Sequence, residues 1–405
     1  MPPQKSVCLL SFSDFGLGRG EYLAKAMKAI GLEVLVVTNR PVYVASSKMA
    51  EDELNKDKID IVEIPLPRLP YNAVVSRLVL YLFFTIFSFL ILLKSRRSFT
   101  FYYSRGPQPF TEITCYILKL LKGGKIVSDI TDLWPDALEY VEMNSFLKRI
   151  FILFGHAINS LIWSKLDAIV THNEMMAHIL SIRSNIKVYV IHGIIDLDKF
   201  KPVDKKEALE ALPKIVHDKI SNKFVILYAG LLGSFQNPLM IIELAKKMLV
   251  DDKLVFLIVG TGPLKKKMEQ EVKKFRLSNI VFLETLPFDD MPLVYNLADL
   301  LLLTYAPIKF LSIGLPKKFV EYASIGKPIL CITPTCVASK LCTEWKAGYH
   351  FLPHDLENVT HVIQNLEHNV KLRKLLGNNA RKMAQSLFSL EEAKKRLQAV
   401  LDSLK

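Results

Sequence analysis

One stretch decides the fold of this chain: Gly314-Leu-Pro-Lys-Lys-Phe-Val-Glu-Tyr-Ala-Ser-Ile-Gly-Lys-Pro-Ile329. It predicts a loop that leads into a short helix, because Pro316 suits the first helical position and Gly326 the position just after the last turn. Pro328 stops the helix, and the apolar residues 329–332 predict a buried strand. The stretch therefore predicts a loop, a helix and a buried strand in succession.

The start of this helix has the chemistry of an anion site. Lys317 and Lys318 lie in its first turn, where unpaired backbone N–H groups already favour a phosphate. Glu321 lies one turn further on, where a carboxylate can accept hydrogen bonds from sugar hydroxyls. The alternative is that Lys317 and Glu321, four residues apart, form an exposed ion pair worth a few tenths of a kcal/mol.

Strand-length apolar runs alternate with helical patterns twice along the chain, which predicts parallel sheets joined by crossover helices. The first series comprises residues 7–12, 33–38, 99–103, 125–130, 168–171 and 187–191, and the second comprises 223–228, 254–259, 280–283, 300–303 and 329–332. With 405 residues the chain is also too long for one ordinary core. We therefore expect an α/β protein of two Rossmann-like domains, 1–195 and 196–388, and an amphipathic helix, 389–405, that can pack back on the first domain.

Charge and hydropathy together point to a membrane surface as a partner. The chain has 53 lysines and arginines against 40 aspartates and glutamates, a net charge of +13, a pI of about 9.3 and a mean hydropathy of +0.24. A nucleic-acid-binding protein would show a basic stripe with stacking aromatics or a known module, and the sequence has neither. We therefore expect contact with anionic lipid and none with nucleic acid.

The cysteines indicate a reducing compartment. All five are scattered, and none forms a C-x-x-C pair. We expect free thiols, a cytosolic setting and no structural zinc. No protein partner is indicated.

Residues 78–93 form the most apolar segment, with sixteen residues that carry no charge. At about 24 Å of helix, this segment is shorter than a hydrocarbon core of about 30 Å. An interfacial helix, a buried helix and a true span remain open, and we expect the first, with the protein held peripherally on the cytoplasmic face of the membrane. Residues 146–163 could extend the same patch. The candidate lipid contacts are Arg77, Leu78, Phe83, Phe84, Phe87, Leu93, Arg96 and Arg97.

Glycine-rich turns follow three of the predicted strands, at residues 16–20, 228–238 and 259–264. The first turn reads G-x-G-x-G and not the G-x-G-x-x-G of a redox Rossmann enzyme. In the second turn we expect Asn237 to cap a helix that begins at Pro238. The glycines expected to bring backbone N–H groups close to phosphates are Gly230, Gly233, Gly260 and Gly262. For the first turn, with Gly16 and Gly18, an ordinary tight turn stays open as the alternative to a phosphate-binding loop.

Several segments resemble the retaining glycosyltransferases of family 4, and the resemblance covers nearly the whole chain. Residues 190–200 resemble the family's "pNGvDxxxF" linker, with His192 where asparagine is usual. Residues 129–136, Asp-Ile-Thr-Asp-Leu-Trp-Pro-Asp, resemble the "DLWP" segment of the subgroup that builds polyprenyl-linked surface glycans. The turn 233–236 and the helix 315–322 suit the same subgroup.

The resemblance implies the GT-B fold, with two Rossmann-like domains facing across a cleft, and sugar transfer with retention of configuration. The donor would be a nucleotide sugar of the UDP or GDP type, bound by the C-terminal domain without a metal or other cofactor. The acceptor would be a membrane-held, polyprenyl-linked glycan bound by the N-terminal domain. The matching donor-binding candidates are the six glycines with Gln236, Leu286, Lys317, Lys318 and Glu321, of which Glu321 would hold the ribose.

Three features depart from the family pattern. Ile313 stands where the first of two glutamates is usual, and the basic pair after the first strand of the second domain is missing. The family's cleft histidine is not evident near Thr131 and Asp132. Lys318 is then the leading catalytic candidate to neutralise the leaving diphosphate, with Lys309 second. Asp132 is the candidate to orient the acceptor hydroxyl or to stabilise charge on the sugar, and the alternative is that it caps the following turn.

Other functions stay open at this point. Asp196-Leu-Asp198 matches a metal-binding D-x-D but lies in the linker segment, so we expect no metal there. A sugar-nucleotide epimerase or hydrolase could share the fold, and an inactive membrane partner subunit would explain Ile313. Turnover of a nucleotide sugar with and without a lipid acceptor separates these functions.

Overall fold

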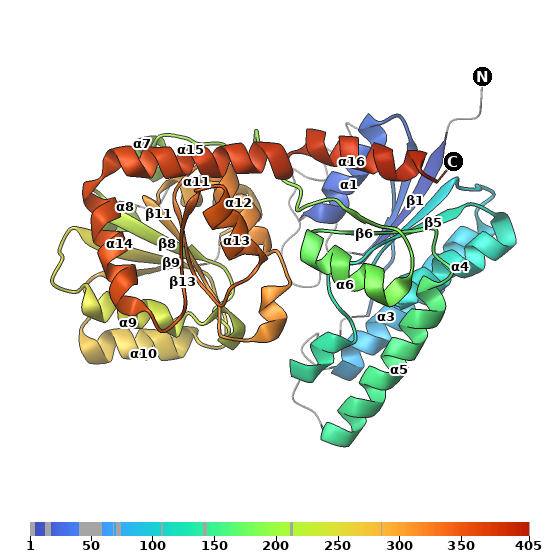
Figure 1. Ribbon diagram of the computed structural model, residues 1–405, viewed down its shortest axis with the longest axis horizontal. Coiled ribbons are helices and arrows are strands. Elements are labelled where there is room, and N and C mark those ends of the chain that lie inside the picture. Colours follow the sequence, from blue (N-terminus) through green and yellow to red (C-terminus); the bar gives the residue numbers. More distant parts are fainter. Residues whose placement is uncertain are drawn as a thin grey trace. The chain divides into compact units, whose positions relative to one another are not determined.

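The structure is a computed structural model that describes residues 5–12, 18–39, 59–67, 69, 74–106, 108–140, 144–210, 214–284 and 286–404. These residues form two compact units (Figure 1). The N-terminal unit comprises Met1–Ile194 with Leu390–Lys405, and the C-terminal unit comprises Ile195–Ser389. Both points at which the chain passes between the units lie within one residue of the expected boundaries.

The N-terminal unit is built on a seven-stranded parallel sheet in the order β3-β2-β1-β4-β5-β6-β7. The strands are β1 (Ser6–Ser11), β2 (Glu33–Thr38), β3 (Asp60–Glu63), β4 (Phe101–Arg105), β5 (Lys125–Asp129), β6 (Ala168–Thr171) and β7 (Val188–Val190). The strand order reverses between β1 and β4. The carboxyl ends of these two strands therefore flank the switch point, where open α/β sheets bind ligands.

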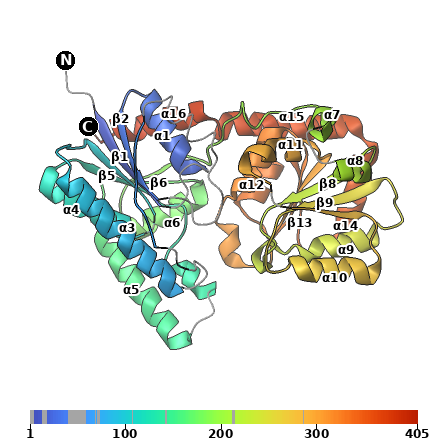
Figure 2. The same ribbon diagram turned by 180° about the vertical axis from the view of Figure 1, so that it is seen from behind.

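Helices cover both faces of this sheet (Figures 1 and 2). They are α1 (Arg19–Ala29), α3 (Val74–Lys94), α4 (Phe110–Lys122), η1 (Asp136–Tyr140), α5 (Ser145–Trp163), α6 (Glu174–Ser184) and α16 (Leu390–Asp402). On one face, Leu23 and Met27 of α1 and Leu397 of α16 join Leu9 of β1 in one buried core. On the opposite face lie α3, α4 and α5. A central parallel strand needs cover on both faces, because neighbouring side chains point to opposite sides.

Helix α3 is longer than the apolar pattern predicted. It has 21 residues, or about 32 Å, so the expectation that this segment is too short to cross a bilayer was wrong. By length and composition, α3 and α5 are both candidate spans. One face of α3 buries Leu80, Phe84 and Leu92, and Phe84 packs edge-on against Phe12 at 5.3 Å between ring centres. Phe84 was therefore wrongly predicted to contact lipid, because it points into the protein.

The C-terminal unit has a six-stranded parallel sheet in the order β10-β9-β8-β11-β12-β13. Its strands are β8 (Phe224–Ala229), β9 (Leu254–Val259), β10 (Ile280–Leu283), β11 (Leu300–Thr304), β12 (Ile329–Ile332) and β13 (Gly348–Phe351). Its helices are α7 (Lys205–Glu210), α8 (Lys214–Ile220), η2 (Ser234–Gln236), α9 (Leu239–Lys247), α10 (Lys265–Phe275), η3 (Phe288–Asp290), α11 (Met291–Asn296), η4 (Lys309–Ser312), α12 (Lys317–Ile325), α13 (Val337–Glu344), α14 (Leu356–His368) and α15 (Val370–Leu387). The switch point of this sheet lies between β8 and β11.

Each predicted strand is present within two residues of its expected bounds, so the two-sheet α/β prediction is confirmed. The strands β3 and β13 were missed. Both lie at a sheet edge, and neither contains a fully buried residue. An edge strand can stay half exposed, so it lacks the continuous apolar run that marks a central parallel strand.

Two helix starts differ from the prediction by one residue. Pro316 is the N-cap of α12 and not its first helical residue, although Gly326 ends the helix in the left-handed conformation as expected. Asn237 does not cap α9. It has a φ of 49° at the end of η2, and Pro238 occupies the N-cap position instead.

Candidate functional site

The glycines of the C-terminal unit allow two loops to pack together at the carboxyl ends of β8 and β9. The N–H of Gly230 donates to the carbonyl of Val259 at 2.9 Å. A Cβ on Gly260 would lie 2.0 Å from the Gly230 oxygen, and a Cβ on Gly262 would lie 2.6 Å from the Leu232 oxygen. The N–H of Gly230 is therefore not the phosphate ligand that the glycine pattern predicted, because it already bonds to the neighbouring strand end.

Lys318 extends from the first turn of α12 over Gly230. A Cβ at position 230 would lie 2.6 Å from the Lys318 Nζ. This Nζ donates to the hydroxyl of Tyr228 at 3.2 Å and lies 4.3 Å from the centre of the Tyr228 ring. Burial lowers the pKa of Lys318 to about 8, although the nearby Glu321 carboxylate opposes the shift. A cation is thus fixed at the carboxyl end of β8, and glycine is what leaves room for it.

Glu321 is buried one turn further along α12 and is held from two sides. The hydroxyl of Tyr295 on α11 donates to its Oε2 at 2.7 Å. The Nζ of Lys317 lies 3.4 Å from its Oε1 and 3.8 Å from the centre of the Phe288 ring. The Glu321 side chain is only 7% exposed, against 49% for Lys317, so this is not the exposed pair of the alternative. Each carboxylate oxygen has a second acceptor position with which it can bind a sugar hydroxyl.

The other donor candidates lie in neighbouring turns. A Cβ on Gly233 would lie 2.8 Å from the Oε1 of Gln236, so this glycine accommodates the Gln236 side chain of η2. Leu286 is partly buried in the loop after β10. Lys309 begins η4, and Ile313 directly follows that turn. The structure therefore groups Lys317, Lys318 and Glu321 on α12, with Gly230 next to the Nζ of Lys318.

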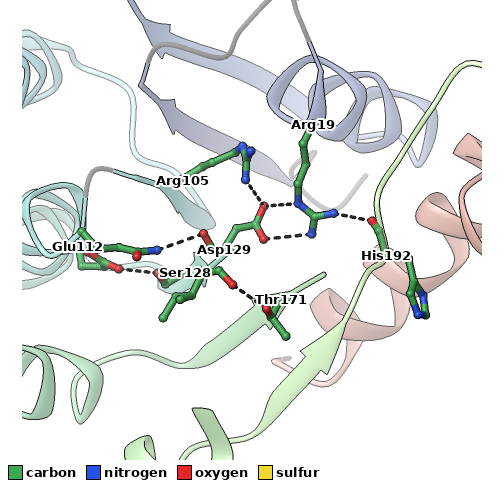
Figure 3. Close-up of polar contacts among 9 residues, drawn as sticks. Arg19, Arg105, Glu112, Ser128, Asp129, Thr171 and His192 are labelled. Carbon is green, nitrogen blue, oxygen red and sulfur yellow. Dashed lines mark hydrogen bonds and ion pairs between the residues drawn. The ribbon is translucent and has the colours of Figure 1, made fainter. Parts of the chain in front are cut away.

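In the N-terminal unit, the main polar feature is a buried carboxylate at the carboxyl end of β5 (Figure 3). Asp129 is bound by both Nε and Nη2 of Arg19, at 2.8 and 3.0 Å, and by Nη1 of Arg105 at 3.1 Å. Its side chain is fully buried. Burial alone would raise the pKa of Asp129, but the two guanidinium groups hold it below its usual range. This cluster adjoins the β1/β4 switch point, since Arg105 ends β4 and Arg19 begins α1.

A second layer of hydrogen bonds surrounds the Asp129 cluster (Figure 3). The hydroxyl of Ser128 donates to Oε1 of Glu112 at 2.7 Å, and burial raises the pKa of Glu112 to about 7. The Nη1 of Arg19 donates to the carbonyl of His192 at 2.5 Å. His172, at the end of β6, has a pKa lowered to about 3 by burial and by the Arg19 charge. It is therefore a neutral structural histidine at physiological pH.

Asp132, the acceptor-side catalytic candidate, lies three residues beyond Asp129 and is exposed. Its backbone carbonyl accepts from the N–H of Trp134 at 3.1 Å. Among the residues that the structure describes, none donates a hydrogen bond to its carboxylate, so Asp132 does not cap the following turn there. Gly18 is the N-cap of α1, beside the cluster, and Gly16 lies outside the described residues.

Sequence reasoning missed Arg19, Arg105 and Asp129 as a group. Each had a signal: Arg19 lies inside the first glycine-rich turn, Arg105 ends a strand, and Asp129 opens the segment that resembles "DLWP". Parallel strands bring their carboxyl ends to one edge of the sheet. Charged residues at those ends should therefore have been considered together.

The D-x-D motif of the linker has a structural role. The Oδ1 of Asp196 accepts from the N–H groups of Asp198 at 2.8 Å and Lys199 at 3.0 Å. Over the described part of the chain, no group of three or more histidine, cysteine, aspartate or glutamate side chains could hold a metal ion. All five cysteines are free and buried.

We expect Asp129→Asn to destabilise the protein by about 3–5 kcal/mol, because it leaves two buried guanidinium groups without their counter-charge. Urea unfolding of the full chain at pH 7 measures the change. Asp60→Asn is the matched control, since Asp60 pairs with Arg97 at 2.6 Å while both side chains are about half exposed. The control should cost less than about 1 kcal/mol. Equal losses in the two variants would contradict the role given to Asp129.

We expect the stabilising effect of Glu112→Gln to grow with pH. A pKa of about 7 in the folded protein, against 4.5 unfolded, means that the folded state retains a proton that the unfolded state releases. Stability is therefore lost as pH rises from 4.5 through 7, by at most roughly 3 kcal/mol. Glutamine has no proton to release and keeps an acceptor for Ser128. Urea unfolding at pH 5 and pH 8 measures the difference, with the exposed Glu139→Gln as control, and a difference independent of pH would be the contrary result.

Comparison with known proteins gives the same fold and, for part of the chain, a match to a family model. Residues 213–383 match the family model described as glycosyl transferases group 1. The "Uncharacterized glycosyltransferase MJ1069" of Methanocaldococcus jannaschii is 20% identical over 274 residues, which are 65% of this chain and 66% of that protein, just under two thirds. Among solved structures, Anabaena Alr3699/HepE in complex with UDP and glucose has a TM-score of 0.69 at 15% identity, covering 99% of this chain and 100% of that one.

A further solved structure covers both units as well. WaaG, a glycosyltransferase involved in lipopolysaccharide biosynthesis, has a TM-score of 0.63 at 16% identity, over 96% of this chain and 98% of its own. At such identities the structures show the fold alone, which is GT-B. The match to the family of group 1 glycosyl transferases lies within the C-terminal unit, and the solved structures show that the GT-B fold extends over both units.

Proposed function

We propose that this protein transfers a sugar from a nucleoside diphosphate sugar to a hydroxyl of a membrane-held, polyprenyl-linked glycan, with retention of configuration. The observation that carries the donor half is the grouping of Lys318 and Glu321 on α12, above Gly230. A partly buried ammonium and a buried carboxylate one turn apart suit the two polar parts of such a donor. Lys318 neutralises the diphosphate, and Glu321 accepts from the ribose hydroxyls.

The charge of Lys318 matters most when the donor bond breaks. The leaving nucleoside diphosphate gains negative charge in the transition state, and a fixed cation beside it stabilises that charge with little reorganisation. The departing phosphate can then take the proton of the acceptor hydroxyl. We propose that lysine supplies the positive charge and that transfer needs no bound metal. The solved Anabaena HepE structures contain UDP or UDP-glucose, which makes uridine the first base to test.

The acceptor half rests on the outer surface of the N-terminal unit. The exposed apolar residues of α3 lie along one helix face: Val75, Leu82, Phe83, Ile86, Phe87, Leu90 and Leu93. Lys94 and Arg96 are exposed at the end of this helix. An apolar face with a basic border suits the anionic surface of a bilayer. Arg97 contributes less than predicted, because it pairs with Asp60 at 2.6 Å.

We propose that the protein associates peripherally with the cytoplasmic face of the membrane and that α3 does not cross the bilayer. The sheet supports this, because the strands on either side of α3 belong to it. Strands β3 and β4, which precede and follow α3, both lie in the seven-stranded sheet. A helix that crossed the bilayer would have to separate them. A hydrolase or epimerase acting on a free nucleotide sugar would have no use for the exposed face of α3, and an inactive partner subunit would have no use for a charged Lys318.

We expect Lys318→Ala to lower kcat/KM by at least about tenfold, since losing a charge-assisted contact costs roughly 1.5–3 kcal/mol. Glu321→Ala should weaken binding of the nucleoside diphosphate. Isothermal titration with UDP and with GDP measures affinity, and Lys266→Ala, an exposed lysine of α10, is the control. Because the pKa of Lys318 is about 8, affinity should fall as pH rises through 8 and the lysine loses its charge. Unchanged affinity in both variants would refute the donor assignment.

We expect the protein to bind vesicles of phosphatidylcholine and phosphatidylglycerol more tightly than vesicles of phosphatidylcholine alone. High salt should weaken binding without abolishing it, because the apolar contact is not screened. Phe83→Gln combined with Leu90→Gln should reduce binding, whereas Leu375→Gln, an exposed apolar residue of α15, should not. If carbonate releases none of the protein from membranes, and proteases reach residues 1–70 and 100–190 from opposite sides, then α3 spans and the peripheral proposal fails.

A further inference from the structure

Helix α5 has an inner face that holds the segment carrying the acceptor-side candidate. Four side chains or backbone positions on one side of the helix contact residues 134–139. Lys148 donates to the carbonyl of Glu139 at 3.1 Å, and His156 pairs with Asp136 at 3.0 Å. Asn159, which is 2% exposed, donates to the carbonyl of Trp134 at 2.6 Å.

At Gly155 the helix itself packs tightly against the segment. A Cβ there would lie 2.8 Å from both Cβ and Cγ of Pro135, and 2.9 Å from the Trp134 ring. Only glycine lets this turn of α5 touch Trp134 and Pro135 directly. The segment reaches back to Asp132 through the hydrogen bond from the Trp134 N–H to the Asp132 carbonyl, at 3.1 Å. The position of Asp132 is therefore tied to the position of α5.

The outer face of α5 is apolar and uncovered. Phe146 is 71% exposed, Leu153 and Phe154 are each 63% exposed, and Leu161 is 67% exposed. At 100° per residue these side chains point away from the side that carries Lys148, Gly155 and Asn159. Helix α4 contacts both α3 and α5, so the apolar faces of α3 and α5 lie on the same side of the sheet (Figures 1 and 2).

We propose that α5 lies in the membrane interface and that its inner face, through Gly155 and Asn159, positions residues 131–139 for the acceptor. This proposal rests on the proposed function. The outer face of α5 contacts an anionic bilayer. Exposed Arg149 and Lys165 lie near the two ends of α5 and can reach lipid phosphates, and the apolar face continues that of α3. Seating α5 in the bilayer restricts its motion and with it the motion of the segment that it grips. Gly155 and Asn159 are therefore positioning residues, because they act through Trp134 and Pro135.

Hydrogen exchange of the full-length protein, with and without vesicles of phosphatidylcholine and phosphatidylglycerol in equal parts, tests this coupling. In the unmodified protein, vesicles should slow exchange in α5 and also, by at least about threefold, in residues 131–140, because local opening becomes rarer. In Gly155→Ala the added methyl group displaces Pro135, so vesicles should still protect α5 but no longer residues 131–140. Alanine is the stronger helix former, so a weakened α5 cannot explain that result.

Two more variants keep the test decisive. Asn159→Ala removes the hydrogen bond to Trp134 without adding bulk, so it should also reduce the protection of residues 131–140. It serves as the test if Gly155→Ala fails to fold. Ser160→Ala, an exposed position on the same helix, should behave like the unmodified protein. Vesicles that protect α5 but leave residues 131–140 unchanged would overturn the coupling and leave the proposed function intact. Vesicles that protect neither α3 nor α5 would overturn both the coupling and the membrane half of the proposed function.

Discussion

The charge on Asp129 organises the edge of the N-terminal sheet at which β4 and β5 end. A lone carboxylate at a fully buried position would give up its charge, because removal from water penalises the ionised form. Arg19 and Arg105 prevent this, and in doing so they join the start of α1 to the ends of β4 and β5. The same Arg19 donates to the carbonyl of His192, which follows β7. One ion cluster thus fixes the relative positions of four elements around the switch point.

In the C-terminal unit, the elements around the switch point are held together by close backbone packing more than by charge. Gly230, Gly260 and Gly262 let the ends of β8 and β9 approach until their backbones touch, and Lys318 occupies the space above Gly230. A glycine-rich turn in a Rossmann-like sheet is usually interpreted as a phosphate loop. Here the glycines serve packing first, and Gly230 in addition leaves room for Lys318.

Most of the fold could be predicted from the sequence, because central parallel strands are apolar along their whole length and helices between them are periodic. The edge strands β3 and β13 escaped, since half-exposed residues such as Asp60 and His350 hide the pattern. The site was harder to predict. Lys318 and Glu321 share one helix, so their spacing is visible in the sequence. Asp129, Arg19 and Arg105 are up to 110 residues apart, and only the sheet order brings them together.

The apolar helices show a further limit of sequence patterns. Hydropathy shows that α3 and α5 are apolar, but it cannot tell which face of each helix is buried in the protein and which is exposed. Phe84 and Phe87 are three residues apart on α3, yet the first is buried and the second is 41% exposed. On α5 the informative residue is Gly155, which adds nothing to an apolar face. Its lack of a side chain brings Trp134 and Pro135 against the helix, and so it links a surface suited to lipid with a loop suited to an acceptor.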